Sequence, residues 1–293
     1  MGYITRVATI CLIYAISNTG LSIFTGFTGQ FSLGHAAFFA IGAYTAAIFS
    51  SVFHVNFYIA LILGATMSAC VAFIIGWPTL RAKLRSDYFA IATLGFGEAV
   101  RVILENLRIT NGARGLAGIE RHVNFPMVLC FAVLVVILAS NFTKSLQGRA
   151  AVAVREDFVA AEMMGINVFM VRLRSLVISA FLGGFAGGLF AHYITFIQPG
   201  MFAAFLSTQM IAAVVAGGMG SITGPFIATI IFTAVPEILR VASMWRLVAY
   251  GLLLVLIMIF RPQGIFGYRE ISITGIAKTV YRKFFTKPKE VKN

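Results

Sequence analysis

Long apolar runs separated by short polar segments make up most of the chain. Nine runs approach the roughly 17–25 residues that a helix needs to cross a bilayer, and they lie near residues 6–27, 35–53, 56–77, 88–107, 125–142, 175–197, 202–217, 221–236 and 245–260. None shows the ten-residue alternation of apolar and polar positions that is typical of barrel strands. The pattern predicts an all-α, polytopic helical membrane protein with about eight or nine spans, some of them broken or re-entrant.

The composition supports the same class. Hydrophobic residues make up 59% of the 293 residues and charged residues 11%, and the mean hydropathy is +0.92, which excludes an ordinary soluble domain. The first run follows Arg6 and has no small-x-small cleavage site, so we expect a retained span rather than a signal peptide. Cys11, Cys70 and Cys130 lie within apolar runs without metal-ligand spacing. We therefore expect small buried side chains there and no metal site.

Basic residues are unevenly distributed along the chain, whose net charge is +13. They cluster at 81–85, at 144–174 and in the tail after Arg261. The positive-inside rule places all three clusters in the cytoplasm. Two predicted spans separate the first two clusters, so residues 108–124 should lie outside, and so should the N-terminus.

The distribution of apolar and basic residues divides the chain into two parts of unequal size. We expect a membrane domain over residues 1–267, with a cytoplasmic loop at 143–174, and a basic cytoplasmic tail over 268–293. A nucleic acid would also favour basic residues, but a juxtamembrane segment that meets anionic lipid is the simpler interpretation of the tail. We therefore expect membrane lipid, and no nucleic acid, as the partner of the tail.

The loop 143–174 is the largest hydrophilic segment, and it is too short for an ATP-hydrolysing domain. The chain contains neither a GxxxxGK[ST] phosphate loop nor an HExxH motif. Ala150, Val154, Phe158 and Ala161 recur at steps of three and four, which predicts a short amphipathic helix that Gly165 ends. Such a helix suits either the lipid headgroups or a groove on a cytoplasmic partner, and the pattern favours neither.

Two glycine-rich segments interrupt the apolar runs. They read "FTGFTGQFSLGHAAFFAIGAY" at 24–44 and "AGGMGSITGP" at 216–225, with a similar glycine spacing in the two halves of the chain. Paired breaks of this kind point to broken helices around a midplane substrate site, although small residues also allow close helix packing. On the first interpretation, the residues of the breaks line a translocation path: Gly29, Gln30, Ser32, Gly34, His35, Gly217, Gly218, Gly220 and Ser221. Gln30 and Ser32 would then cover freed backbone groups or meet the charged ends of a substrate.

Charged side chains also occur inside the fourth run. Glu98, Arg101, Glu105 and Arg108 follow one another at helical spacing, which predicts one stripe, and Glu98 should lie about 15 Å into the membrane. Glu98 and Arg101 either form a structural pair or line the path. His35 and His192 stand alone among apolar residues, which favours a structural hydrogen bond over a proton relay.

Five motifs in order resemble the LivM-type permeases of branched-chain amino acid ABC importers. They are "TGFTGQFSLGHAAFFAIGAYTAA", "LRSDYFAIATLGFGEAVRVIL", "GRAAVAVREDFVAAEMMGINV", "AGGMGSITGP" and "LIMIFRPQGIFG". The resemblance implies a permease subunit of the bacterial inner membrane, working with a second permease subunit, two cytoplasmic ATPase subunits and a periplasmic amino-acid-binding protein. It also implies that this chain binds no cofactor, because its partners hydrolyse the ATP.

The family resemblance gives the loop a docking role on the ATPase. The usual EAA-x3-G pattern is present here as 159–165, with Val159 in place of the glutamate. The coupling residues that the resemblance implies are Arg155, Glu156, Asp157, Ala160, Ala161, Glu162 and Gly165. Related permeases carry urea, short amides or other amino acids, so these remain alternative substrates. An ion-coupled secondary transporter and a membrane scaffold are the competing function classes.

Overall fold

The computed structural model describes residues 2–82 and 86–238 and the isolated positions 251, 255, 259, 260 and 264. The helices are α1 (Tyr3–Leu21), continued by the π-helical turn η1 (Ser22–Gly26), α2 (His35–Ser51), α3 (Phe57–Arg81), α4 (Ser86–Asn106), α5 (Phe125–Lys144), α6 (Leu146–Glu156), α7 (Phe158–Met163), α8 (Val168–Ile194), α9 (Ala204–Gly217) and α10 (Thr223–Ile238). Short 3-10 turns are η2 (Arg108–Thr110), η3 (Gly112–Arg114) and η4 (Pro199–Phe202).

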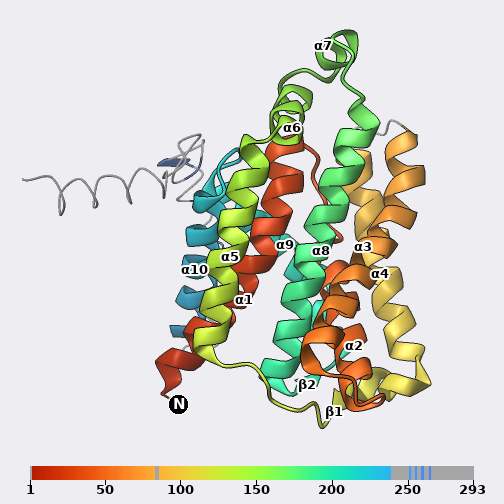
Figure 1. Ribbon diagram of the computed structural model, residues 1–293, viewed down its shortest axis with the longest axis vertical. Coiled ribbons are helices and arrows are strands. Elements are labelled where there is room, and N and C mark those ends of the chain that lie inside the picture. Colours follow the sequence, from red (N-terminus) through yellow and green to blue (C-terminus); the bar gives the residue numbers. More distant parts are fainter. Residues whose placement is uncertain are drawn as a thin grey trace, which may run out of the picture.

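The long helices run side by side and give the molecule two distinct ends (Figure 1). At one end, the strands β1 (Leu116–Ala117) and β2 (Phe196–Ile197) form a two-residue antiparallel ladder, and the N-terminus lies at the same end. At the other end, α6 and α7 project beyond the bundle. We call these the ladder end and the α7 end. The N-terminus and residues 108–124 thus share one end, and the loop 143–174 turns at the other.

The helical membrane class is confirmed, and each of the first eight predicted runs contains one helix. Five segments are long and apolar enough to cross a membrane: Tyr3–Gly26, Phe57–Arg81, Phe125–Lys144, Val168–Ile194 and Pro199–Gly217. The apolar helices α2 and α10 are shorter. Helix α8 begins at Val168, earlier than the predicted residue 175, because Asn167 caps it by accepting from Met170 N. Most of the run 245–260 and the whole tail 268–293 lie outside the described residues.

The first helix lies at the centre of the bundle. Of the apolar window in Tyr3–Gly26, 78% is buried, against 28% for Phe125–Lys144, and α1 packs against α5, α8, α9 and α10. The apolar side chains that α3 and α5 expose face outward, as in helices that contact lipid or another subunit. The expectation of three buried cysteines is wrong for Cys70 and Cys130, which lie on these outward faces, and right for Cys11 on α1.

Helices α2, α3 and α8 approach one another through small residues. A Cβ added to Gly42 would overlap the backbone of Gly184, and one added to Gly64 would lie 2.7 Å from the Gly42 carbonyl oxygen. Ser68 fills the same contact, with its hydroxyl 3.0 Å from the carbonyl oxygen of Phe38 and 2.9 Å from that of Ala180. Glycine therefore sets the distance between these three helices, as small residues do in membrane bundles.

We expect Gly42→Ala to destabilise the protein. The added methyl group meets backbone, which cannot rotate away, and overpacking of this kind costs about 1–3 kcal/mol. The matched control is Gly95→Ala, because a Cβ at Gly95 has no atom within 4 Å and alanine favours the helix by about 1 kcal/mol. The apparent melting temperature in detergent should fall for Gly42→Ala and stay level or rise for Gly95→Ala. Equal melting temperatures would contradict the close contact.

Candidate functional site

The first chain break connects α1 to α2 through non-helical backbone inside the protein. Gly29 has a φ of +70°, residues 29–32 follow no regular structure, and helix resumes at His35. Gln30 and Ser32 are buried, Gln30 with only 3% of its surface exposed. Gly29 lies about 35–40 Å along from Tyr3 by helical rise. The break therefore starts near the α7 end and runs inward, rather than lying wholly at the midplane as predicted.

Hydroxyl groups from other helices bind the backbone of this break. Three N–H groups donate to three side-chain oxygens: Phe31 to Ser86 at 3.2 Å, Leu33 to Thr93 at 3.1 Å and Ala36 to Ser207 at 3.0 Å. Ser86 and Thr93 belong to α4 and Ser207 to α9. Buried backbone groups must be paired within the protein, so α4 and α9 hold the break in place.

The first of the two roles predicted for Gln30 and Ser32, covering freed backbone groups, is filled by other residues at the N–H groups of Phe31, Leu33 and Ala36. Their side-chain oxygens, Gln30 Oε1 and Ser32 Oγ, are buried and have no hydrogen-bond partner among the described residues. The sequence analysis missed Ser86, Thr93 and Ser207. The only signal in the sequence was that these hydroxyl residues lie in or beside two of the predicted runs, 88–107 and 202–217.

The second break separates α9 from α10. Gly218 and Gly220 have φ values of +115° and +108°, which favour glycine, and the Cβ of any other residue at Gly217 would meet the backbone of Pro225. The hydroxyl of Ser221 accepts a hydrogen bond from the N–H of Gly224 at 3.3 Å. Each of the predicted glycines thus has a backbone conformation or a close contact that excludes larger residues.

The two breaks contact each other. Ser22 donates its hydroxyl proton to the carbonyl oxygen of Ser221 at 3.1 Å, and a Cβ added to Gly26 would lie 3.4 Å from the nitrogen of Gly220. Nearly the whole described chain separates these segments in sequence. The predicted glycine-rich segments therefore form one junction, which lies toward the α7 end.

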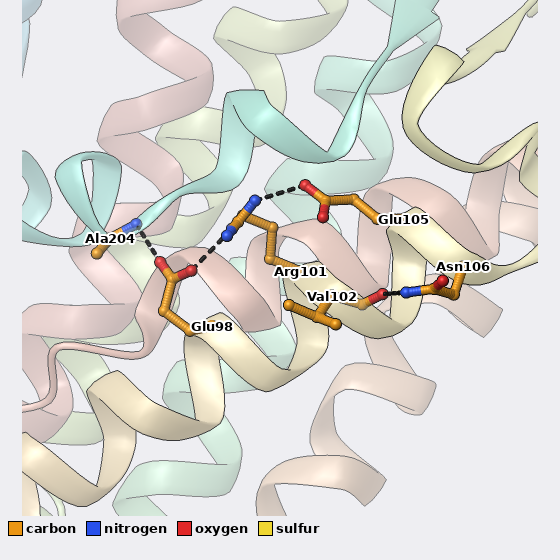
Figure 2. A network of polar contacts seen from close by, with 6 residues as sticks. All are labelled: Glu98, Arg101, Val102, Glu105, Asn106 and Ala204. Carbon is orange, nitrogen blue, oxygen red and sulfur yellow. Dashed lines mark hydrogen bonds and ion pairs between the residues drawn. The ribbon is translucent and has the colours of Figure 1, made fainter.

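Glu98 and Arg101 form a separate polar network on α4 (Figure 2). Arg101 Nε donates to Glu98 Oε2 at 2.8 Å, and Arg101 Nη1 donates to Glu105. Glu98 Oε1 also accepts from the N–H of Ala204, the first residue of α9, at 3.2 Å. The other end of α9, at Gly217, lies about 20 Å away by helical rise. The predicted path residues therefore occupy two places and do not form one cluster.

One expectation about ionisable residues is corrected by the structure, and another agrees with it. Arg108 does not continue the stripe, because α4 ends at Asn106 and Arg108 begins η2. His35 is buried, with Nε2 3.2 Å from the Ser17 carbonyl oxygen, as a structural histidine would be.

At the ladder end, the ring of His192 lies 6.2 Å from that of His122, whose Nε2 is 3.3 Å from Glu120 Oε2. The sequence analysis missed this second cluster because its members lie about 70 residues apart. Within the described residues, no group of three His, Cys, Asp or Glu is placed to hold a metal ion.

The loop 143–174 contains two helices instead of the single predicted one. Asp157 interrupts the pattern because its Oδ1 accepts from the N–H groups of Val159 and Ala160, at 2.8 and 3.0 Å, and so caps α7. Gly165, with a φ of +81°, follows the end of α7 as predicted. The loop therefore projects a short, separately capped helix.

The surface of α7 differs from the expected docking face. Met163 and Met164 are 85% and 83% exposed, and Phe158 and Val159 are about half exposed. Ala161, in contrast, is 4% exposed and packs within the chain, so it offers no direct contact to a partner. Glu156, Asp157, Ala160, Glu162 and Gly165 are exposed.

Arg155 faces the membrane bundle. Its Nη1 donates to the carbonyl oxygen of Gly26 at 2.9 Å, and a Cβ added to Gly29 would lie 3.0 Å from Arg155 Cγ. Its Nη2 lies 2.6 Å from Glu156 Oε1. Arg155 thus connects the α6–α7 segment directly to the first break, an interaction across 129 positions that no sequence spacing indicates.

Comparisons with known proteins show which family and which relatives the chain resembles. Residues 3–260 match the family described as the permease component of the branched-chain amino acid transport system. The high-affinity branched-chain amino acid transport system permease proteins LivM of Escherichia coli and Salmonella typhimurium are each 34% identical over 88% of this chain and 69% of their own length. A probable LivM of Methanocaldococcus jannaschii is 25% identical over 75% of this chain and 72% of that protein. No solved structure gives a significant match.

The Glu98, Arg101 and Glu105 network yields a test that separates its two interpretations. We expect Arg101→Gln to lower the apparent melting temperature, because it leaves two carboxylates facing each other without the cation. The triple variant Glu98→Gln, Arg101→Gln and Glu105→Gln keeps amide hydrogen bonds without charge and should recover most of the loss. A triple variant less stable than Arg101→Gln would contradict this account. Full transport by the stabilised triple variant would show that the charges are structural.

Proposed function

Because the chain belongs to the family of branched-chain amino acid transport permease components, we propose that it forms the translocation path for branched-chain amino acids in an ABC importer. It is a multi-pass membrane protein. We place it in the bacterial inner membrane, with the α7 end and the basic tail 268–293 in the cytoplasm and the N-terminus outside. The membrane domain is residues 1–267.

One observation carries the proposal: the α6–α7 segment joins an exposed apolar surface to a chain break. Met163 and Met164 are the last residue and the C-cap of α7 and are highly exposed, while Arg155 on the preceding helix binds the Gly26 carbonyl oxygen. A partner bound to α7 would therefore pull on the first break through one hydrogen-bonded side chain. This arrangement suits a permease whose conformational change is driven by another subunit.

The proposed partners are those that a permease driven by another subunit requires. We propose two cytoplasmic ATPase subunits at the α7 end, a second, related permease subunit against an outward apolar face, and an amino-acid-binding protein at the ladder end. ATP hydrolysis and nucleotide binding belong to the ATPases, and this chain itself needs no cofactor. The junction of the two breaks, with Gln30 and Ser32 at its inner wall, is the proposed cytoplasmic part of the path.

An ion-coupled secondary transporter is the second candidate. Its supporting observation is the polar network of Glu98 and Arg101 inside a helix of the bundle. That network is tied to α9 through the N–H of Ala204, so its acceptor groups already have partners. Uptake by the purified chain alone, driven by an ion gradient, would favour this candidate over the importer.

The double variant Met163→Glu and Met164→Glu tests the docking surface. Two carboxylates in an apolar contact cost several kcal/mol when they are desolvated without partners, so the ATPase should no longer copurify and uptake of L-leucine should fall at least tenfold. Both measurements are made in cells that coexpress the complete importer.

Leu146→Glu is the matched control, because Leu146 is also a large exposed apolar residue at the α7 end but begins α6. It should retain copurification and uptake. Normal ATPase binding by the methionine variant would mean that α7 lies on lipid or solvent instead. The buried Ala161 is less informative, since a large substitution there would disturb the loop itself.

Single cysteines test the proposed orientation. In a background with Cys11, Cys70 and Cys130 replaced by alanine, Ala113→Cys should react with an impermeant maleimide added to whole cells, and Gln147→Cys only in inside-out vesicles. Both positions are exposed, and Ala113 is preferable to the neighbouring Asn111, whose φ of +57° would strain another residue. Reaction of both cysteines from the same side would overturn the topology.

A further inference from the structure

A cavity of about 560 Å³ lies between the first break and the α6–α7 segment. Its wall includes Gly29 and Gln30 of the break, Arg155 of α6, Phe158 of α7 and Arg172 of α8. The volume is within the range of about 300–1,000 Å³ that is typical of small-molecule sites. The cavity thus lies where the loop 143–174 meets the membrane bundle.

Two residues of this wall carry a buried polar atom with unused hydrogen-bonding capacity. Gln30 Oε1 is an acceptor on a side chain that is only 3% exposed, and Arg172 Nε is a buried donor; neither has a partner among the described residues. Leaving such groups unpaired costs about 1–3 kcal/mol each. Both residues line one cavity, so rotation of their side chains toward it would offer an acceptor and a cation to a ligand with both a positive and a negative end.

The rest of the wall combines polar residues, among them Thr28, Ser86 and Asn167, with apolar ones. Leu80, Val154, Phe158 and Phe169 contribute to it, and the guanidinium of Arg172 lies 5.7 Å from the centre of the Phe158 ring. The carboxylate of Glu162 is also in the wall. The cavity therefore offers a cation, acceptor oxygens and apolar surface, which are the three complements of an amino acid with a hydrophobic side chain.

We propose that this cavity binds a free branched-chain amino acid from the cytoplasm. The carboxylate of the ligand pairs with Arg172, its ammonium group donates to Gln30 Oε1 and faces Glu162, and its side chain packs against Leu80 and Phe158. The assignment of the ligand class and of the cytoplasmic side rests on the proposed function.

Occupancy of the cavity would have a consequence for transport. A bound ligand bridges Gln30 in the break and Arg172 in α8, so it holds the break against the segment that carries α7. Movement of the break relative to α6 and α7 then requires the ligand to leave. Product that accumulates in the cytoplasm would therefore slow further import through the permease subunit.

Equilibrium binding to the complete importer in nanodiscs tests the site. With tritiated L-leucine as the probe, and without binding protein, we expect saturable binding that L-isoleucine displaces. 4-Methylpentanoate lacks the ammonium group, 3-methylbutylamine lacks the carboxylate, and both should compete weakly. Arg172→Gln and Gln30→Leu should each weaken leucine binding about tenfold, as expected for the loss of one hydrogen bond to a charged group.

Arg174→Gln is the matched control, because Arg174 lies on the same helix but lines a different cavity, with Phe142 and Gln147. It should bind leucine like the unmodified protein, and normal size-exclusion profiles of all three variants would show that they fold. Lack of saturable binding, or binding that survives both Arg172→Gln and Gln30→Leu, would overturn the proposal. Displacement by glycerol phosphate but not by isoleucine would also overturn it, in favour of a lipid headgroup.

The transport assay separates this proposal from the proposed function. Uptake of L-leucine driven by binding protein and ATP, together with no leucine bound at the cavity, would leave the importer intact and remove only the cytoplasmic site. Absence of any uptake driven by ATP, with a folded complex, would instead count against the importer itself.

Discussion

A polypeptide that leaves the helical conformation inside a membrane must find partners for its N–H and C=O groups within the protein. Here this constraint applies to the non-helical residues 29–34 and the helix ends beside them, and side chains of three other helices help to satisfy it. Hydroxyls of Ser86, Thr93 and Ser207 accept from the break, and Arg155 donates to it. The break is consequently the place where α4, α6 and α9 are connected, although none of these helices is its neighbour in sequence.

Glycine contacts allow the helices around the break to pack closely. Helices α2, α3 and α8 meet at Gly42, Gly64 and Gly184 with no room for a methyl group, and α1 is buried against α8 on another side. Such close packing lets many weak contacts act together. The closely packed part of the molecule therefore lies toward α2, α3 and α8, whereas the two glycine-rich breaks meet toward α6 and α7.

The sequence predicted the features that depend on local pattern. Apolar run length located the helices, and glycine spacing located both breaks and the end of α7 at Gly165. Contacts between residues that are far apart in the sequence could not be predicted from it. Arg155 and Ala161 were both expected to couple the loop to the ATPase, whereas Arg155 binds Gly26 and Ala161 is buried within the chain. Asp157 was overlooked as a helix cap because the apolar spacing continues through it. The run 245–260 lies mostly outside the described residues, so its prediction is still open.

The start of α9 carries a further consequence. Ala203 offers no side chain to cap this helix, and the carboxylate of Glu98 on α4 binds the first free N–H, that of Ala204, instead. A negative group at this position also favours the helix dipole. Sliding α9 along its axis would break this bond, whereas tilting about Ala204 would preserve it. With glycines at its opposite end, α9 connects the carboxylate of Glu98 to the second break, so a tilt about Ala204 would displace that break in proportion to the length of the helix.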